Sequence, residues 1–304
     1  MWIKVDEHMV SVSIVIRTMF KRSFLKDILA VLNNQIKKGD EIIIVNDSRE
    51  EVVIPDYIKK YGTKVFKSEK HGYAQARNAG IAHATKEIIA FLDDDCLPES
   101  NWLIEIKKTY VQSKDIGGVG GSLILYRDEG SLRKMEELGM FLTDFLFGDR
   151  KAVGKIHPSG LVTGNFDPVG DIREVDHLNG SNLSFRRKAL EGIWADEYFG
   201  GVGYREETDV CVNVTKRGYK LIFNPKAVVH HHIGQTRRTK GSLYSKHYNH
   251  YYFWKKNFKF SYIFFVRELL EAFLLILGGI FTFNKSYFAG VKGKIDGLRE
   301  FVLK

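Results

Sequence analysis

An apolar strand that ends in three consecutive acids is the feature that most constrains this chain. Residues 88–92 (IIAFL) are bounded by polar residues, which is the pattern of a strand buried on both faces of a parallel sheet. Asp93, Asp94 and Asp95 follow directly. Acids at the carboxyl end of such a strand lie where open α/β sheets bind their ligands. Because adjacent carboxylates repel one another, the pattern favours a divalent cation shared with phosphate oxygens over a solvated acidic turn.

Strands and helices alternate along the first part of the chain. The apolar patterns predict strands over 11–16, 41–45, 64–66, 88–92 and 117–125, and helices over 24–32, 73–84 and 99–112. This order implies right-handed βαβ units and a mostly parallel sheet flanked by helices. We interpret residues 127–174 as an insertion or mobile loop. The remaining predicted elements are a strand at 183–185, helices at 187–192 and 206–216, and closing strands at 220–223 and 227–230.

The composition fits a folded protein with one large domain or one domain plus an appendage. The 304 residues are 44% hydrophobic and include two cysteines, Cys96 and Cys211, which lie outside any disulfide or zinc pattern and so favour a reducing compartment. Residues 1–10 show no secretory signal, so we expect a cytoplasmic protein. The net charge of +9 favours an anionic membrane or a phosphorylated substrate as partner. No nucleic-acid-binding pattern is found, and we expect no nucleic acid as partner.

The composition changes near residue 242. Residues 244–265 are dense in aromatic and basic side chains, and residues 272–283 form a run of twelve without a charge. That run is too short to cross a bilayer, which takes about 20 apolar residues. We predict a helical C-terminal region over 242–304 that contacts a membrane surface through an interfacial element. The alternative is a set of helices packed on the catalytic domain or on a second subunit.

Six short motifs follow one another in a defined order. They are Asp47 after the second strand, 71–80 (HGYAQARNAG), the acids at 93–95, 179–182 (NGSN), 204–209 (YREETD) and 229–232 (VHHH). Each is weak alone, but together they resemble the inverting nucleotide-sugar glycosyltransferases of family 2, which have the GT-A fold. The resemblance covers residues 11–234, which we predict to be the catalytic domain. It implies a Rossmann-like sheet and a nucleoside-diphosphate sugar as donor.

The resemblance also implies a set of donor-binding residues. One of them would line the nucleotide pocket, one would contact the base, two would lie beside the diphosphate, and the first acid of the 93–95 cluster would contact the ribose or stabilise the loop. Thr18 would line the pocket and Asp47 would contact the base. Arg77 and Asn78 would lie beside the diphosphate. Asp93 is the acid that would contact the ribose or stabilise the loop, and Asp94, the middle acid of the cluster, is also predicted to bind the donor.

A metal ion, Mg²⁺ or Mn²⁺, is implied by the same resemblance, with Asp95, Asp93 and His231 as its ligands. Such an ion neutralises the diphosphate leaving group. His230 and His232 are close enough in sequence to compete for the role of His231. Alternation along a strand places His230 and His232 on one face and His231 on the other. A fortuitous exposed histidine cluster is the alternative.

Inverting transfer needs a general base that deprotonates the acceptor hydroxyl. The resemblance places this base in an acidic pair before a helix, and here the pair is Glu206-Glu207. Glu207 stands where the family has aspartate and is the predicted base, with Glu206 as its rival. Asp209 is expected to support the site. Simple capping of a helix N-terminus is the alternative for these acids.

Several departures from the family pattern matter. Residues 17–22 (RTMFKR) replace the usual Pro-Thr-Tyr-Asn-Arg, 46–49 (NDSR) lacks the usual glycine, and Glu207 is one methylene longer than aspartate. The Gln-x-x-Arg-Trp motif of processive synthases is missing, since 235–238 (QTRR) stops short of it. We therefore expect transfer of a single sugar rather than polymerisation.

The sequence as a whole predicts a metal-dependent, inverting transferase that moves one sugar to a hydroxyl of a glycan or lipid-linked glycan. Such an enzyme would serve polysaccharide or other cell-surface glycoconjugate synthesis at the inner face of the cell membrane. A sugar-phosphate nucleotidyltransferase is less favoured because residues 16–22 lack a glycine-rich loop. A phosphatase with an Asp-x-Asp nucleophile is less favoured still. A non-catalytic membrane-surface protein on a degenerate transferase scaffold ranks last, because the acids of the base and the metal site are present.

Overall fold

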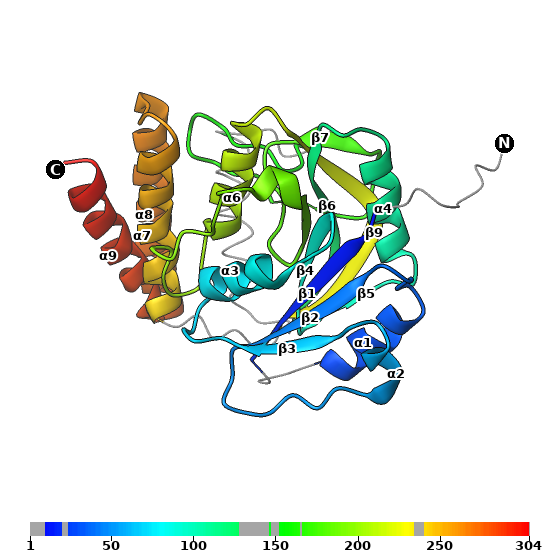
Figure 1. Cartoon of the computed structure of the whole chain (residues 1–304). Coiled ribbons are helices and arrows are strands. Elements are labelled where there is room, and N and C mark those ends of the chain that lie inside the picture. The colour runs from blue at the N-terminus through cyan, green and yellow to red at the C-terminus, as the bar shows by residue number, and fades with distance from the viewer. Residues whose placement is uncertain are drawn as a thin grey trace.

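The fold is taken from a computed structural model, which describes residues 10–19, 24–127, 146, 152–164, 166–233 and 240–303. One sheet forms the centre of the molecule, with helices on both of its faces and three C-terminal helices side by side at one end (Figure 1). Within the described part, the strand order is β3-β2-β1-β4-β8-β6-β9-β5, and β7 pairs with β9.

The first half of the sheet is parallel and matches the sequence prediction. Its strands pair in the order β3-β2-β1-β4, and each paired register is parallel. The connecting helices carry apolar faces against the sheet. These elements are β1 (Val12–Thr18), α1 (Leu25–Asn33), β2 (Glu41–Asn46), α2 (Asp56–Lys59), β3 (Lys64–Lys67), α3 (Tyr73–His83) and β4 (Ile88–Asp93).

The second half of the sheet is mixed rather than parallel. Strand β8 (Asn182–Arg186) runs antiparallel to both β4 and β6 (Ile116–Arg127), whereas β9 (Lys220–Ile233) is parallel to β6. Two short strands, β5 (Cys96–Pro98) and β7 (Arg173–Val175), add antiparallel edges on β9. The predicted α/β class is therefore confirmed, and the sheet as a whole is mixed.

The two closing strands predicted at 220–223 and 227–230 form the single strand β9. Its pairing with β6 shifts register between Gly121 and Leu123, opposite Asn224 and Val229. The backbones approach closely at this irregularity, since a Cβ on Gly121 would lie 1.8 Å from the carbonyl oxygen of Ala227. Half of the predicted loop at 127–174 lies outside the described residues, as do residues 20–23 and 235–238 of the motifs above.

Two apolar layers hold the helices to the sheet. Side chains of α1 and α4 (Trp102–Val111) pack with Ile14 and Ile16 on one face. Ala74 and Ala76 of α3 pack with Val15 on the other face, together with α6 (Glu206–Thr215). The segment predicted as a short helix at 187–192 is a 3-10 turn, η1 (Arg187–Leu190). This packing of helices on both faces of the sheet places the carboxyl ends of β1, β2 and β4 beside the N-termini of α3 and α6.

The C-terminal region forms three helices that pack on the catalytic part. They are α7 (Lys240–Asn257), α8 (Tyr262–Thr282) and α9 (Ser286–Phe301). Phe199 and Val212 of the catalytic part share an apolar cluster with residues of α7 and α8. No helix among the described residues is long and apolar enough to cross a membrane. The division into 11–234 and 242–304 stays a prediction, because residues 234–239 at the junction are not described.

Candidate active site

The predicted metal ligands Asp95 and His231 lie close together where β5 pairs with β9. Cys96 on β5 stands opposite His231 on β9 in their antiparallel register. The Nε2 atom of His231 lies 3.4 Å from Oδ1 of Asp95. The Cys96 thiol donates to the same carboxylate oxygen at 3.4 Å. One candidate ligand atom from each of the three residues lies within 4.8 Å of the others, so the cluster is compact enough for one ion.

The chemistry of this cluster fits a hard divalent cation such as Mg²⁺ or Mn²⁺. Burial acts to raise the pKa of Asp95, but the hydrogen bond and charge of His231, together with the hydrogen bonds from Cys96 and the backbone, hold the pKa below its usual value. Burial raises the pKa of the Cys96 thiol well above its usual range, so the sulfur stays protonated and is a poor ligand. The protein thus offers one carboxylate and one imidazole, which leaves coordination positions for water and phosphate oxygens.

The structure separates the three adjacent histidines. His230 and His232 both stack on Tyr126, and His230 also contacts Glu99 at 3.2 Å. His231 faces the other side of β9, toward Asp95. This is the alternation that the sequence predicted, and it favours His231 as the metal-binding candidate.

The two remaining acids of the cluster occupy different environments. Asp94 accepts hydrogen bonds from the Thr18 hydroxyl at 2.5 Å and from the Met19 amide at 3.1 Å, and so ties the end of β4 to β1. Asp93 accepts a hydrogen bond from the Ser181 hydroxyl at 3.2 Å. Burial, followed by repulsion from Asp95, raises the pKa of Asp93. Asp93 does not belong to the compact metal cluster, and its part in metal or ribose binding stays a prediction.

The predicted general base, Glu207, lies beside the turn that carries Ser181. A Cβ on Gly180 would be 3.5 Å from Cγ of Glu207 and 3.7 Å from Nη2 of Arg77. Burial raises the pKa of Glu207 to about 7, and the neighbouring Glu206 carboxylate adds to this shift. A carboxylate that titrates near neutral pH is well suited to accept a proton during transfer. The turn at Gly180 and Ser181 thus lies between Glu207 and Asp93.

The other two acids of α6 have structural partners. Glu206 is buried and accepts a hydrogen bond from Nε of Arg77 at 2.8 Å. Asp209 is buried on another side of the helix, where Lys256 and Asn257 of α7 contact it at 2.8 Å and 2.6 Å. The expectation that Asp209 supports the site stays untested, but its contacts fasten α7 to the catalytic part. Of these three acids, Glu206 and Asp209 form ion pairs, and Glu207 forms none with the described residues.

Asn78 holds a neighbouring loop in place. Its amide nitrogen donates to the carbonyl of Ala195 at 2.9 Å, and its amide oxygen accepts from the Ala195 nitrogen at 2.8 Å. Both polar atoms of the side chain are therefore engaged with the backbone of one residue, Ala195. The contact of Asn78 with the diphosphate stays a prediction. Its two hydrogen bonds to Ala195 fasten the loop at that residue to α3.

Asp47 anchors a further cluster at the ends of β1 and β2. Its Oδ2 atom accepts from Nη2 and Nε of Arg17 at 2.6 Å and 3.2 Å, and its Oδ1 atom lies 2.7 Å from Nδ1 of His71. The Arg17 guanidinium lies 4.0 Å from the centre of the Tyr73 ring. Of these four residues, the sequence singled out only Asp47 as a site residue. The available signal was a charged residue, Arg17, at the end of an otherwise apolar strand.

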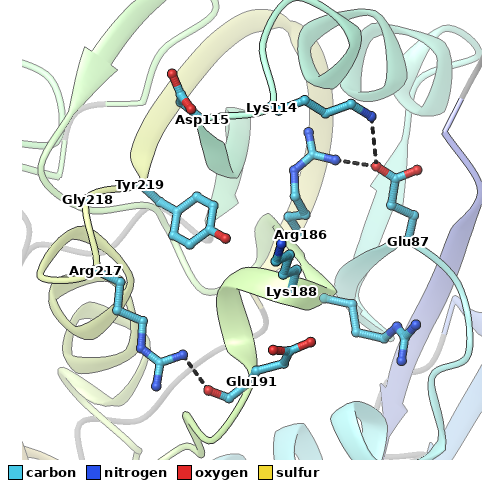
Figure 2. Close-up of a pocket in the computed structure, with 10 residues that line it drawn as sticks. Glu87, Lys114, Asp115, Arg186, Lys188, Glu191, Arg217, Gly218 and Tyr219 are labelled. Carbon is cyan, nitrogen blue, oxygen red and sulfur yellow. Dashed lines mark hydrogen bonds and ion pairs between the residues drawn. The ribbon is translucent and has the colours of Figure 1, made fainter.

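A separate cavity of about 710 Å³ opens at the opposite edge of the sheet (Figure 2). Glu87 precedes β4, Lys114 and Asp115 precede β6, and Arg217 lies just before β9, so the amino ends of these strands line it. Arg186 pairs with Glu87, and the backbone of Glu191 accepts from Arg217. The cavity is therefore distinct from the acids at the carboxyl ends of β2 and β4.

An α/β sheet of this topology, with acids and a histidine at its carboxyl edge, is the arrangement that the resemblance to GT-A glycosyltransferases led us to expect. The chain belongs to glycosyltransferase family 2: the model of the family described as "Glycosyl transferase family 2" matches residues 13–165, half of the chain. One curated relative is the glucosyl-dolichyl phosphate glucuronosyltransferase of Haloferax volcanii. It is 26% identical over 227 residues, which span 71% of this chain and 66%, just under two thirds, of the relative.

Solved glycosyltransferases share the fold at low sequence identity. The mannosyltransferase PcManGT from Pyrobaculum calidifontis, solved with GDP-Man and Mn²⁺, has a TM-score of 0.51 and 16% identity over 96% of this chain and 75% of its own. GalNAc-T7, solved with UDP, GalNAc and Mn²⁺, has a TM-score of 0.54 and 14% identity over 98% of this chain and 59% of its own. At such identities the likeness establishes the fold.

Proposed function

We propose that the protein is an inverting, metal-dependent transferase that moves one sugar from a nucleoside-diphosphate sugar to an acceptor hydroxyl. The observation that carries this proposal is Glu207, a half-buried carboxylate with a pKa raised to about 7 beside the turn that leads to Asp93. In the proposed reaction Glu207 takes the proton of the acceptor hydroxyl as its oxygen attacks the anomeric carbon. The bond from that carbon to the diphosphate breaks on the opposite face, which inverts the configuration.

The surrounding side chains keep the base in place. Arg77 pairs with Glu206 and lies over the ring of Phe91, which orients the N-terminus of α6. Asp95 and His231 would hold a divalent ion that stabilises the negative charge of the departing diphosphate. Two neighbours of the same fold were solved with Mn²⁺, which supports a divalent ion in general.

A lipid-linked glycan is the acceptor that we propose. The Haloferax volcanii relative is named for a dolichyl phosphate substrate, and the C-terminal helices of this chain offer a surface for lipid. Helix α8 exposes apolar side chains along its outer face, with Leu269 73% and Phe273 55% exposed. The three charged residues of α8, Arg267, Glu268 and Glu271, instead pair with each other or with Lys294 of α9. Its outer face therefore carries no charge.

The charges around this face suit an anionic membrane. Residues 240–304 contain eleven Lys and Arg against four Asp and Glu. Lys259 precedes α8 and Lys285 follows it, and both are exposed. Apolar helix faces flanked by lysines and aromatic rings bind at the boundary between headgroups and acyl chains. We accordingly propose that the enzyme rests on the inner face of the cell membrane through α8.

Replacing Leu269 and Phe273 together by Glu tests the membrane contact. We expect at least a ~10-fold loss of binding to vesicles that contain phosphatidylglycerol, because two charges would enter the apolar boundary. Co-sedimentation measures the bound fraction. Val53→Glu with Tyr57→Glu, two exposed positions on the catalytic part, is the matched control and should bind like wild type. The proposed membrane contact would be ruled out if the α8 variant sedimented with vesicles like wild type. It would also be ruled out if the two substitutions broke up a dimer instead of weakening vesicle binding.

A nucleotide-sugar panel tests the transferase itself. Purified protein is mixed with each nucleoside-diphosphate sugar in turn, with and without Mn²⁺, and the melting temperature is recorded. A ligand that binds the native state alone raises this temperature. We expect a shift that depends on Mn²⁺, followed by transfer that gives a product with inverted anomeric configuration by NMR. A product of retained configuration would exclude the direct displacement.

A further inference from the structure

Arg205 carries a buried positive charge that no acid neutralises. The residue is 6% exposed, and its guanidinium forms no hydrogen bond or ion pair with the described residues. Its Nε atom is fully enclosed and has no hydrogen-bond partner. Glu206, the next residue in the chain, pairs with Arg77 instead. Because a buried charge without a partner is costly, a site that keeps one is suited to an anion that binds from outside the chain.

The backbone at Arg205 is strained as well. Its φ of 74° lies in the left-handed region, where residues other than glycine are uncommon. Arg205 directly precedes α6, whose first turn carries Glu206 and Glu207. Residues held in such conformations cluster at active sites and ligand-binding sites. The strain is therefore a second indication, independent of the charge, that this position binds a ligand.

A second unpaired cation lies against the same aromatic ring as Arg205. The guanidinium carbon of Arg205 is 4.4 Å from the centre of the Tyr204 ring, and Nζ of Lys246 is 5.3 Å from that centre. Lys246 belongs to α7 and likewise makes no hydrogen bond or ion pair within the described part of the chain. An aromatic face attracts a cation but does not neutralise it. Both cations therefore keep their capacity to bind an anion beside Tyr204.

This cationic pair lies between the proposed base and the C-terminal helices. Tyr204 and Lys246 are half-buried, so the site reaches the surface. Burial, and then the charge of Arg205, lower the pKa of His250 in α7 well below its usual value, which places the guanidinium near that helix. Helix α7 shares an apolar cluster with α8, whose outer face is the proposed lipid contact. A molecule with a glycan at one end and a lipid at the other would have its middle here.

We propose that Arg205 and Lys246 bind the phosphate that joins glycan and lipid in the acceptor. Arg205 donates hydrogen bonds to the phosphate oxygens, and Lys246 adds a point charge. The glycan then extends toward Glu207 and the lipid toward α8. The inference rests on the proposed function and names the chemistry of its acceptor, since a free glycan lacks this phosphate. Headgroups of membrane phospholipids share the chemistry, and the experiments below separate the two sources.

Farnesyl phosphate and farnesol are the probes, because they share an apolar chain and differ in the phosphate. Calorimetry with the whole chain, without metal ions and below the micellar concentration, gives a dissociation constant for each. We expect farnesyl phosphate to bind ~10-fold or more tightly than farnesol, since charge-assisted hydrogen bonds add to the shared apolar contacts. Equal binding of the two probes would overturn the phosphate site.

Three variants assign this preference to its residues. Arg205→Gln removes the charge, and we expect the preference for farnesyl phosphate to fall to about 2-fold or less. Lys246→Gln should lower the preference in the same direction. Lys255→Gln alters an exposed cation of the same helix and is the matched control, which should bind both probes like wild type. A wild-type preference in Arg205→Gln would overturn the proposal.

The melting temperature of the unliganded protein separates binding from a structural role. Because Arg205 has no partner among the described side chains, Arg205→Gln should melt at or above the wild-type temperature. A clear fall in the melting temperature would show that Arg205 supports the fold, and the proposal would be wrong.

Two further measurements with Arg205→Gln identify the source of the phosphate. Nucleotide binding with Mn²⁺ should match wild type, and its loss would assign Arg205 to the donor and overturn the inference. Sedimentation with phosphatidylglycerol vesicles should also match wild type, and its loss would assign the site to headgroups and overturn the inference as well. If wild type binds no nucleotide in the panel above, the transferase proposal falls, and the acceptor assignment falls with it. A failure of the phosphate preference alone leaves the transferase standing.

Discussion

Replacing Glu207 by Gln is expected to abolish sugar transfer while leaving donor binding intact. The amide has nearly the shape of the carboxyl group but cannot take a proton from the acceptor hydroxyl, and a positioned base contributes about 10²–10⁴-fold to such reactions. The side chain is half-buried and keeps its size, so the fold should not change. Turnover with the donor and acceptor measures the loss, and calorimetry with the nucleoside diphosphate measures the donor affinity.

A nearby acid provides the control for this variant. Glu197→Gln alters a partly exposed carboxylate that contacts Lys70 on the surface, and it should keep activity close to wild type. Transfer retained by Glu207→Gln would rule out Glu207 as the base. The proton acceptor would then be sought in Glu206, whose Oε1 atom already accepts a hydrogen bond from Arg77 at 2.8 Å.

The pH dependence of the wild-type enzyme tests the same assignment independently. Because the base acts in its deprotonated form and the pKa of Glu207 is raised to about 7, kcat/KM should rise with pH below 7 and level off above it. The slope of log kcat/KM against pH should approach one on the acidic side. An activity that is flat from about pH 5 to pH 8 would exclude a base with this pKa.

Replacing Asp95 by Asn is the second change with a large expected effect. Asp95 supplies the carboxylate of the compact cluster, in which its Oδ1 atom lies 3.4 Å from Nε2 of His231. Losing that charge should weaken Mn²⁺ binding and lower transfer by about 10³-fold, since metal ions stabilise developing charge by several kcal/mol. Mn²⁺ affinity is measured by electron paramagnetic resonance in the absence of donor.

Asp115→Asn serves as the control, because Asp115 lies at the opposite edge of the sheet and lines the separate cavity. It should bind Mn²⁺ and turn over like wild type. His231→Ala should weaken Mn²⁺ binding in the same direction as Asp95→Asn, whereas His230→Ala should not. Wild-type Mn²⁺ affinity in Asp95→Asn would show that the ion binds elsewhere.

Local patterns in the sequence determined the elements of the fold and the edge at which the site lies. The apolar run before Asp93 predicts a buried strand because burial on both faces demands apolar residues at every position. Strand alternation likewise separates His231 from its two neighbours before any contact is known. The order of these motifs was sufficient to identify the family, since each motif marks the end of one element.

Tertiary structure alone decided which partners these residues meet. The antiparallel pairing of β5 with β9 brings Cys96 opposite His231, although 134 residues lie between them in the sequence. On α6, Glu207 and Asp209 lie about 200° apart around the helix axis, so one faces the turn at Gly180 and the other faces α7. The pairing of Arg17 with Asp47 and His71 depends on the register of β1 against β2. Such contacts result from packing between distant segments, which periodicity within one segment does not encode.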